Sequence, residues 1–124
     1  MAFTTPTQVS LYVNQKQTKK TFVTTGTGAQ DGGYIDGLQA DVSIQAKGSD
    51  AALVMAVQIT MSPRSDVDAG TALWLDATGL TAIANVAKAA KLAYGATAWR
   101  LNVGTAAAAS TAEVVCLENS NIPI

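Results

Sequence analysis

The sequence predicts a small all-β protein, a single antiparallel β-sandwich of about seven strands with a jelly-roll-like arrangement. Its 124 residues suit one domain with one core, and no linker divides residues 1–124. Hydrophobic residues make up 48% of the chain, which argues against disorder. Short segments in which apolar and polar residues alternate recur along the chain, separated by turn-forming residues.

The N-terminal part of the chain contains two predicted strands and two predicted loops. Residues 8–14 alternate between polar and apolar side chains, and residues 21–25 are β-branched or aromatic, so each segment is predicted as a strand. Residues 14–20 are polar and basic, which indicates a loop. Residues 26–37 are rich in glycine and also contain aspartate, which predicts a long turn or exposed loop.

The clearest strand pattern lies in the middle of the chain. Residues 40–46 alternate and precede a predicted turn at 47–50, and residues 53–61 carry apolar side chains on both faces. One face of 53–61 stays apolar to its end, whereas the other becomes polar at Gln58 and Thr60. This pattern predicts a central strand that is buried on both sides at its start and solvated at its end. The expected inward residues are Leu53, Met55, Val57, Ile59 and Met61.

Three further strands are predicted in the second half. Pro63 ends the central strand, and residues 62–70 are expected to form a loop. Residues 71–76, 98–103 and 112–117 have strand patterns. In residues 98–103, Trp99, Leu101 and Val103 share one face, opposite Arg100 and Asn102. In residues 112–117, Val114 and Cys116 share one face, and Val115 and Leu117 share the other.

Residues 80–94 fit two structures. Leu80, Ile83 and Tyr94 follow helical spacing, whereas Val86, Lys88 and nearby apolar residues also fit the period of a strand. A short helix and a strand therefore both stay open for this alanine-rich segment.

Composition and charge narrow the function classes. Charged residues make up only 14% of the chain and the net charge is −1, so no overall field attracts nucleic acid or a membrane surface. A surface with few charges loses little solvation energy when it packs against other subunits, which suits an assembly protein. No apolar run is long enough for a membrane span, and no secretory signal precedes the first strand. We therefore expect a chain made in a cytosol, or one that has lost its signal.

The residue types that support most catalysis are missing. Histidine is absent and Cys116 is the only cysteine, so the sequence offers no Ser-His or Cys-His pair and no internal disulfide. We expect no catalytic residues, no cofactor and no metal. Cys116 is predicted to be an inert core residue.

Two segments resemble fragments of ligand-binding loops. Asp66 and Asp68, two positions apart and followed by Gly70, could supply oxygen ligands for calcium, but the rest of such a loop is missing. Turn hydrogen bonds therefore explain these aspartates better, although the sequence leaves cation binding open. The glycines at 26–28 and 31–33 lack a following Gly-Lys-Ser/Thr, so a hairpin tip explains them better than a phosphate site.

Lysines and tryptophans give two more candidates. Lys16, Lys19 and Lys20 form a basic cluster that could contact an acidic neighbour, although a solvated loop is the simpler interpretation. Trp74 and Trp99 could stack on a sugar, but in so small a sandwich they more often fill the core.

Residues 53–118 resemble the pattern of small β-sandwich proteins in tailed-phage virions. The resemblance rests on Val57-Gln58-Ile59, a turn with Asp66, Trp74-Leu75-Asp76, Trp99-Arg100-Leu101-Asn102-Val103 and Ala112-Glu113-Val114-Val115. It implies a head decoration, head-fibre or tail-associated subunit, often a trimer, located in the virion and made in the host cytoplasm. The implied partners are copies of the chain and other virion proteins such as the major capsid protein.

Two function classes remain at this point. One is a virion structural or auxiliary subunit that acts by self-assembly and surface attachment. The alternative is a carbohydrate- or surface-binding module such as an adhesin or receptor-binding domain. An exposed aromatic platform would favour the binding module, and a flat face with few charges would favour the assembly subunit. The apolar end of the chain, residues 122–124, is a candidate for contact with a neighbouring subunit.

Overall fold

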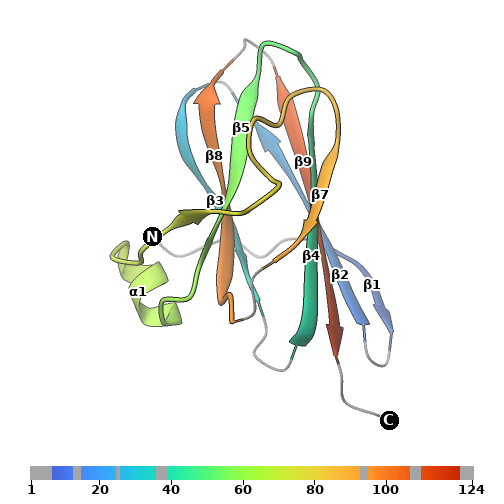
Figure 1. Ribbon diagram of the computed structural model, residues 1–124, viewed down its shortest axis with the longest axis vertical. Helices are drawn as coiled ribbons and strands as arrows, with labels where there is room; N and C mark the ends of the chain where they lie inside the picture. Colours follow the sequence, from blue (N-terminus) through green and yellow to red (C-terminus); the bar gives the residue numbers. More distant parts are fainter. Residues whose placement is uncertain are drawn as a thin grey trace.

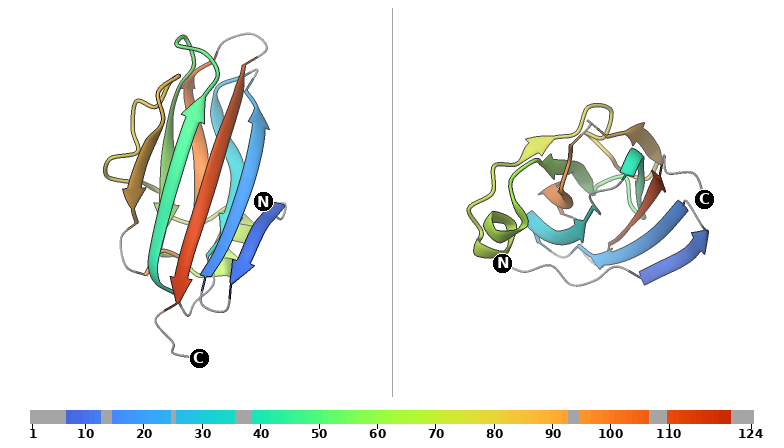
Figure 2. Two further views of the ribbon diagram at one scale, coloured as in Figure 1. Left: turned by 90° about the vertical axis from the view of Figure 1, so that its right-hand side faces the viewer. Right: turned by 90° about the horizontal axis from the view of Figure 1, so that it is seen from below.

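The computed structural model describes residues 7–12, 15–24, 26–35, 39–92, 95–106 and 110–120. These residues form two antiparallel sheets that pack face to face (Figure 1), and the view from below shows the two layers (Figure 2). The first sheet has five strands in the order β1-β2-β9-β4-β7, and the second has four in the order β3-β8-β5-β6. The predicted all-β sandwich is therefore confirmed, although the described chain holds nine strands where about seven were expected.

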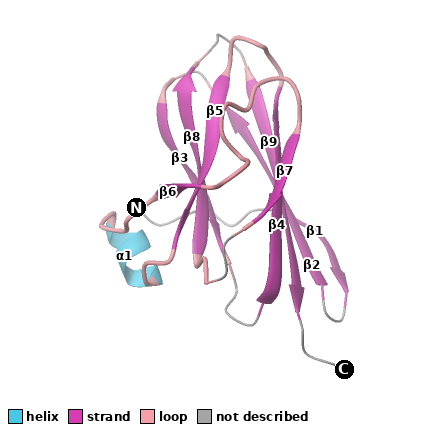
Figure 3. Cartoon of the chain, in the orientation of Figure 1, coloured by secondary structure: helices cyan, strands magenta, loops and turns pink. Residues whose placement is uncertain are grey.

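Strands account for most of the described chain (Figure 3). The first sheet contains β1 (Thr7–Tyr12), β2 (Gln15–Val23), β4 (Gln39–Gly48), β7 (Lys88–Lys91) and β9 (Thr111–Ser120). The second contains β3 (Gly28–Tyr34), β5 (Val54–Thr60), β6 (Leu75–Asp76) and β8 (Ala98–Thr105). A six-residue helix, α1 (Arg64–Ala69), follows β5 and lies beside the four-stranded sheet.

Inward side chains of both sheets form one core. Trp99 on β8 is 1% exposed, and its ring meets Phe22 of β2 edge-on at a centroid distance of 6.3 Å. This contact joins the two sheets. The faces predicted for β8 and β9 are confirmed, and the structure turns these residues of each strand into the core cluster: Trp99, Leu101, Val103, Val114 and Cys116. The strand predicted at 40–46 is also confirmed as part of β4, which continues through Gly48 into the segment predicted as a turn.

The central strand is confirmed at β5. On its second face, however, the start was predicted to be buried and the end solvated, and the structure shows the opposite. Val54 is 37% exposed, whereas Thr60 is 1% exposed. The Thr60 end is covered because the Thr60 carbonyl accepts a hydrogen bond from the amide of Thr97, and its hydroxyl accepts one from the amide of Ser62. Met61, predicted to face inward, is exposed because the strand ends before it.

The loop predicted at residues 14–20 is wrong over residues 15–20, which belong to β2, and Asn14 lies outside the described residues. Phe22 faces the core, so the alternation of the strand turns Lys16, Thr18 and Lys20 inward as well. Unbroken pairing with β9 from Gln15 to Val23 fixes this register. β2 lies between β1 and β9, so its backbone hydrogen bonds to both neighbours hold these residues in a strand although their side chains are mostly polar.

The exposed glycine loop predicted at residues 26–37 is also wrong over most of its length. Residues 28–34 form β3, which pairs with β8 through a register shift between Gln30 and Gly33. Gly32 is buried in this strand, and a Cβ atom there would lie 1.8 Å from the carbonyl oxygen of Trp99. Close approach of two backbones, not a hairpin tip, explains the need for glycine here. Residues 36–38 lie outside the described residues.

Three predictions between residues 62 and 94 need correction. The loop predicted at 62–70 contains α1, which follows Pro63 and ends at Gly70 in the left-handed conformation, with a φ of 79°. The strand predicted at 71–76 is reduced to the two residues of β6. In the described part of 80–94 the structure has β7, and the possible helix is wrong.

Backbone hydrogen bonds explain why residues 80–84 are not helical. Ile83 and Met55 exchange both of their hydrogen bonds, at 2.8 and 2.9 Å, and Val57 donates to the carbonyl of Leu80. These bonds to β5 use groups that a helix would pair internally. Leu80 and Ile83 are fully buried as a result. Residues 93 and 94 lie outside the described residues.

Candidate functional site

A row of three polar side chains crosses the outer face of the four-stranded sheet. Gln58 on β5 pairs in register with Arg100 on β8 and with Asp76 on β6, so the three side chains share one face. Arg100 Nε donates to Gln58 Oε1 at 2.8 Å, and Gln58 Nε2 donates to Asp76 Oδ1 at 3.0 Å. We call Arg100, Gln58 and Asp76 the polar row.

An aromatic ring holds Arg100 in place. The guanidinium carbon lies 4.4 Å from the centroid of the Trp74 ring, which is a cation–π contact. Desolvation by partial burial lowers the pKa of Arg100 from its ordinary value. Trp99 therefore fills the core as predicted, whereas Trp74 lies half-buried on the surface against Arg100.

A second arginine and aromatic ring meet where α1 covers the same face. The Arg64 guanidinium lies 3.9 Å from the centroid of the Tyr34 ring, and the Tyr34 hydroxyl is hydrogen-bonded to Asp68 Oδ1. Tyr34 pairs with Ala98, two residues before Arg100 on β8, so Tyr34 and Arg100 are diagonal neighbours. The outer face thus carries two stacked arginines.

The aspartates of the possible calcium loop are separated by their local contacts. Asp68 bonds Tyr34, and Asp66 Oδ1 lies 3.2 Å from the Thr71 hydroxyl. Among the described residues, no group of three or more histidine, cysteine, aspartate or glutamate residues could hold a metal ion. Both aspartates therefore stabilise the ends and surroundings of α1 in this structure.

An apolar edge lies where the two sheets end in their shortest strands, β6 and β7. Leu73, Leu75 and Met61 are 80%, 61% and 55% exposed. A recess of about 390 Å³ opens beside Met61 and Leu75. Ile59, Ala77 and Leu92 form its apolar wall, and Asp76, Thr78 and Lys91 also line it. We call Met61, Leu73, Leu75 and this recess the apolar edge.

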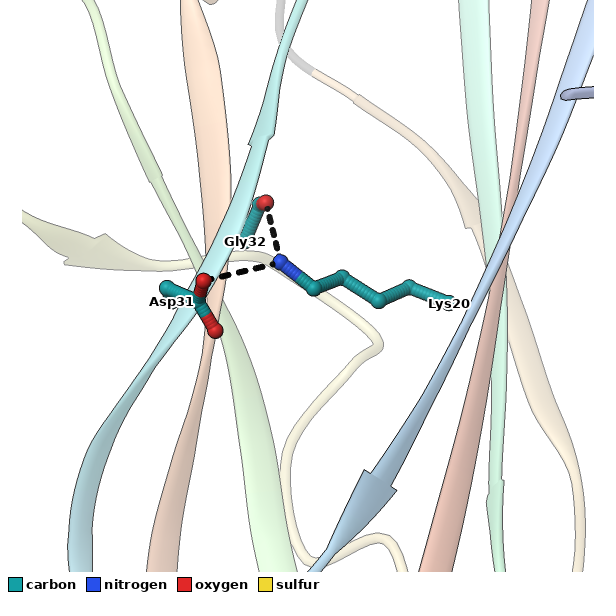
Figure 4. A network of polar contacts seen from close by, with 3 residues as sticks. All are labelled: Lys20, Asp31 and Gly32. Atoms are coloured by element: carbon teal, nitrogen blue, oxygen red, sulfur yellow. Dashed lines mark hydrogen bonds and ion pairs between the residues drawn. The ribbon is translucent and has the colours of Figure 1, made fainter. Parts of the chain in front are cut away.

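The predicted basic cluster is divided between the two faces of β2. Lys19 lies on the outer face, 3.4 Å from a Glu113 carboxylate oxygen. Lys20 points between the sheets, where its Nζ donates to the Gly32 carbonyl at 2.9 Å and lies 3.2 Å from Asp31 Oδ2 (Figure 4). The side chain of Lys20 is 11% exposed, so the solvated loop predicted for these lysines is wrong.

Cys116 has the inert environment that the sequence predicts. Its thiol is buried on the inner face of β9, and its pKa is raised to about 12. Burial is the main cause, the nearby charge of Glu118 adds to it, and Lys16 opposes it. Glu118 is itself 1% exposed and pairs in register with Lys16. This buried carboxyl group lies on a strand whose sequence pattern does not predict it.

The polar row and the apolar edge were also missed from the sequence. Gln58 and Arg100 were placed on the polar faces of their strands, but sequence spacing does not say that β8, β5 and β6 lie side by side. Leu73 and Leu75 were expected in a longer strand. The apolar residues 122–124 lie outside the described residues, so their contact with a neighbour stays a prediction.

Among the residues that the structure describes, no helix has the length and apolar character needed to cross a bilayer.

Comparisons with known proteins give similarities of fold at low identity. No protein-family model and no curated protein sequence matches this chain. Over 90% of its length the chain is similar to 13% of IMPa from Pseudomonas aeruginosa in complex with an O-glycopeptide, with 13% identity and a TM-score of 0.46.

In two further solved structures, the similarity extends over most of the other protein's length. Over 90% of its length this chain is similar to 89% of a chain of the cyanophage Pam1 capsid asymmetric unit, with 17% identity and a TM-score of 0.40. Over its full length it is similar to 85% of a cupin protein from Bacteroides fragilis, with 10% identity and a TM-score of 0.35. All three TM-scores are below 0.5, so these similarities assign neither a family nor a function.

Proposed function

We propose that this chain is a non-catalytic structural subunit of a phage virion, an auxiliary protein that attaches to the particle by self-assembly. The observation that carries the proposal is the apolar edge. Leu73, Leu75 and Met61 are largely exposed, and Met61 and Leu75 line a mostly apolar recess, although the chain has an ample core in which to bury side chains. Grouped exposed apolar side chains mark contact surfaces in soluble proteins.

Edge geometry supports the same proposal. β6 has two residues and β7 has four, so both sheets end at this side in short strands. Lys88 and Lys91 stand on β7, and edge lysines discourage uncontrolled strand pairing. Contact through side chains of the apolar edge, arranged with closed symmetry, would then favour a defined oligomer over open fibres. We expect a trimer, as the resemblance of residues 53–118 implies.

The chemistry of the chain supports a role without catalysis. The sequence contains no histidine, and the raised pKa of Cys116 leaves its thiol protonated at neutral pH. The resemblance to tailed-phage proteins supplies the virion as the location and the major capsid protein as the proposed partner. Mass spectrometry of purified particles tests that location, and absence of the chain from intact virions would count against it.

Self-association is tested by light scattering at micromolar concentration. We expect a mass near three times 12.7 kDa for the unaltered protein. Leu75→Ser and Leu73→Ser should shift the mass toward that of a monomer, with the melting temperature little changed because both positions are exposed.

A matched control uses an equally exposed apolar residue elsewhere. Val23→Ser, at a position that is 69% exposed at the end of β2, should leave the mass unchanged. A mass of 12.7 kDa for the unaltered protein at every concentration would overturn the self-assembly proposal. If the oligomer persists in both leucine variants, the apolar edge is not the surface through which the subunits associate.

A further inference from the structure

The polar row has unused hydrogen-bonding capacity. Arg100 uses only Nε, which leaves the N–H groups of both terminal nitrogens. Gln58 keeps one amide N–H, and Asp76 keeps Oδ2. Within the described part of the chain, no further hydrogen bond or ion pair involves these three side chains. Several donors and an acceptor therefore lie side by side on one face.

These groups are also held in a fixed geometry before any ligand arrives. The hydrogen bond from Arg100 to Gln58 and the ring of Trp74 fix the plane of the guanidinium. The hydrogen bond from Gln58 to Asp76 fixes the amide and the carboxylate relative to each other. All three residues stand on hydrogen-bonded strands. Preorganised polar groups of this kind lose little conformational entropy on binding.

The mixture of groups selects the chemistry of the ligand. A simple anion would be attracted by Arg100 but repelled by the carboxylate of Asp76. A cation would be attracted by Asp76 but repelled by Arg100. A neutral hydroxyl group both accepts and donates a hydrogen bond, so it can accept from Arg100 or Gln58 while it donates to Asp76. Adjacent hydroxyl groups on a sugar ring present such groups in a fixed spacing.

We propose that the polar row is a binding site for the neighbouring hydroxyl groups of a neutral carbohydrate. Arg100 and Gln58 donate to hydroxyl oxygens, Asp76 accepts from a hydroxyl group, and Trp74 orients Arg100 through the stacked contact. This activity goes beyond assembly, because it gives the subunit a means of attaching to a glycan surface. Asp76 also lines the recess of the apolar edge, whereas Arg100 does not, so Arg100→Lys is the variant that tests glycan binding apart from assembly.

The test begins with the full chain on a printed array of neutral glycans, acidic glycans and acidic peptides. The neutral glycans that bind are then titrated in solution by calorimetry. We expect binding of neutral glycans, weakened about tenfold or more by Arg100→Lys and by Asp76→Asn, because each removes a hydrogen bond to a charged group. Arg100→Lys keeps the positive charge and loses the planar donor pair.

Controls separate this site from folding and from assembly. Lys19→Gln removes a positive charge from the opposite sheet and should leave glycan affinity unchanged. Melting curves show that the variants fold, and light scattering follows the oligomer independently of glycan affinity. The proposal is overturned if no neutral glycan binds, if only acidic glycans or peptides bind, or if neutral glycans bind both row variants as tightly as the unaltered protein.

Discussion

Gly32 shows how one residue without a side chain sets the distance between two strands. A Cβ atom at this position would lie 1.8 Å from the Trp99 carbonyl oxygen and 2.6 Å from the Cα atom of Arg100, both backbone atoms of β8. Rotation of a side chain relieves neither overlap. We expect Gly32→Ala to lower the free energy of unfolding by about 3 kcal/mol or more, because β3 must move away from β8. Urea unfolding followed by tryptophan fluorescence measures this change.

Gly26 provides the matched control for that substitution. A Cβ atom there meets no other atom within 4 Å, so Gly26→Ala should change the free energy of unfolding by less than about 0.5 kcal/mol. Equal effects of the two substitutions would contradict the role given to Gly32.

The burial of Cys116 makes the stability of the fold depend on pH in the alkaline range. Its pKa rises from an ordinary value of 9.0 to about 12 in the folded protein, mainly because the thiol is buried. Between these pH values the folded state holds a proton that the unfolded state has lost, so stability is complete below pH 9 and falls as the pH rises toward 12. We expect Cys116 to account for about 1.4 kcal/mol of lost stability at pH 10.

The contribution of Cys116 is isolated by a variant that does not titrate. Cys116→Ala should start from a lower stability at pH 7, because it leaves a small cavity, and should lose less on transfer to pH 10. Urea unfolding at both pH values gives the two differences. The same loss in both proteins would show that other groups carry the alkaline dependence.

At the scale of elements, two ion pairs made by β2 differ in their burial. Lys20 and Asp31 link the two sheets with side-chain exposures of 11% and 30%, whereas Lys19 and Glu113 are 44% and 49% exposed. Removal of one partner of the partly buried pair leaves a charge between the sheets, but exposed pairs contribute little. We expect a coupling energy of about 1 kcal/mol or more for Lys20 with Asp31, and less than about 0.5 kcal/mol for Lys19 with Glu113.

Two double-mutant cycles measure these energies. Lys20→Met with Asp31→Ala forms the first cycle, and Lys19→Met with Glu113→Ala forms the control cycle. If the two cycles gave the same coupling energy, the inward orientation of Lys20 would have no energetic role.

β5 is the element on which the four-stranded sheet depends. It lies between β8 and β6, and Val57 is fully buried at its centre. Val57→Asp would place an unpaired charge in the core, so we expect insoluble or unfolded protein. Val57→Ala should stay folded and lose about 2 kcal/mol. Solubility on expression and thermal melts followed by circular dichroism test both expectations, and an unchanged melting curve for Val57→Asp would refute them.

At the scale of the whole molecule, one continuous core joins both sheets, and we expect it to need no metal for stability. Most of its members come from β2, β4, β5, β8 and β9 and from the segment between β6 and β7, and Ile35, Leu53 and Leu92 flank the ends of strands. A chelator should leave the melting temperature unchanged, and added calcium should not raise it. A fall of several degrees that calcium reverses would instead identify a cation site, with Asp66 and Asp68 the first residues to substitute.

The sequence predicted those strands in which apolar side chains recur regularly on the inner face. β5, β8 and β9 were predicted because their inner faces are apolar almost throughout, as at Leu101 and Val114. β2 and β3 were not predicted as they are, because their inner faces carry Lys20 and Gly32. No site residue of the polar row could be predicted, because Gln58, Arg100 and Asp76 meet only through strand order and register.

The sequence by itself determined the class of fold and the burial of Cys116, and the single domain stays a prediction from the sequence. These properties depend on composition and on local periodicity, which a chain carries wherever its segments come to lie. Only the tertiary structure decided the strand order, the inward turn of Lys20, the role of Gly32, the exposure of the apolar edge and the assembly of the polar row. Each of these depends on contacts between residues far apart in the chain, and local sequence does not encode which strand becomes the neighbour of which.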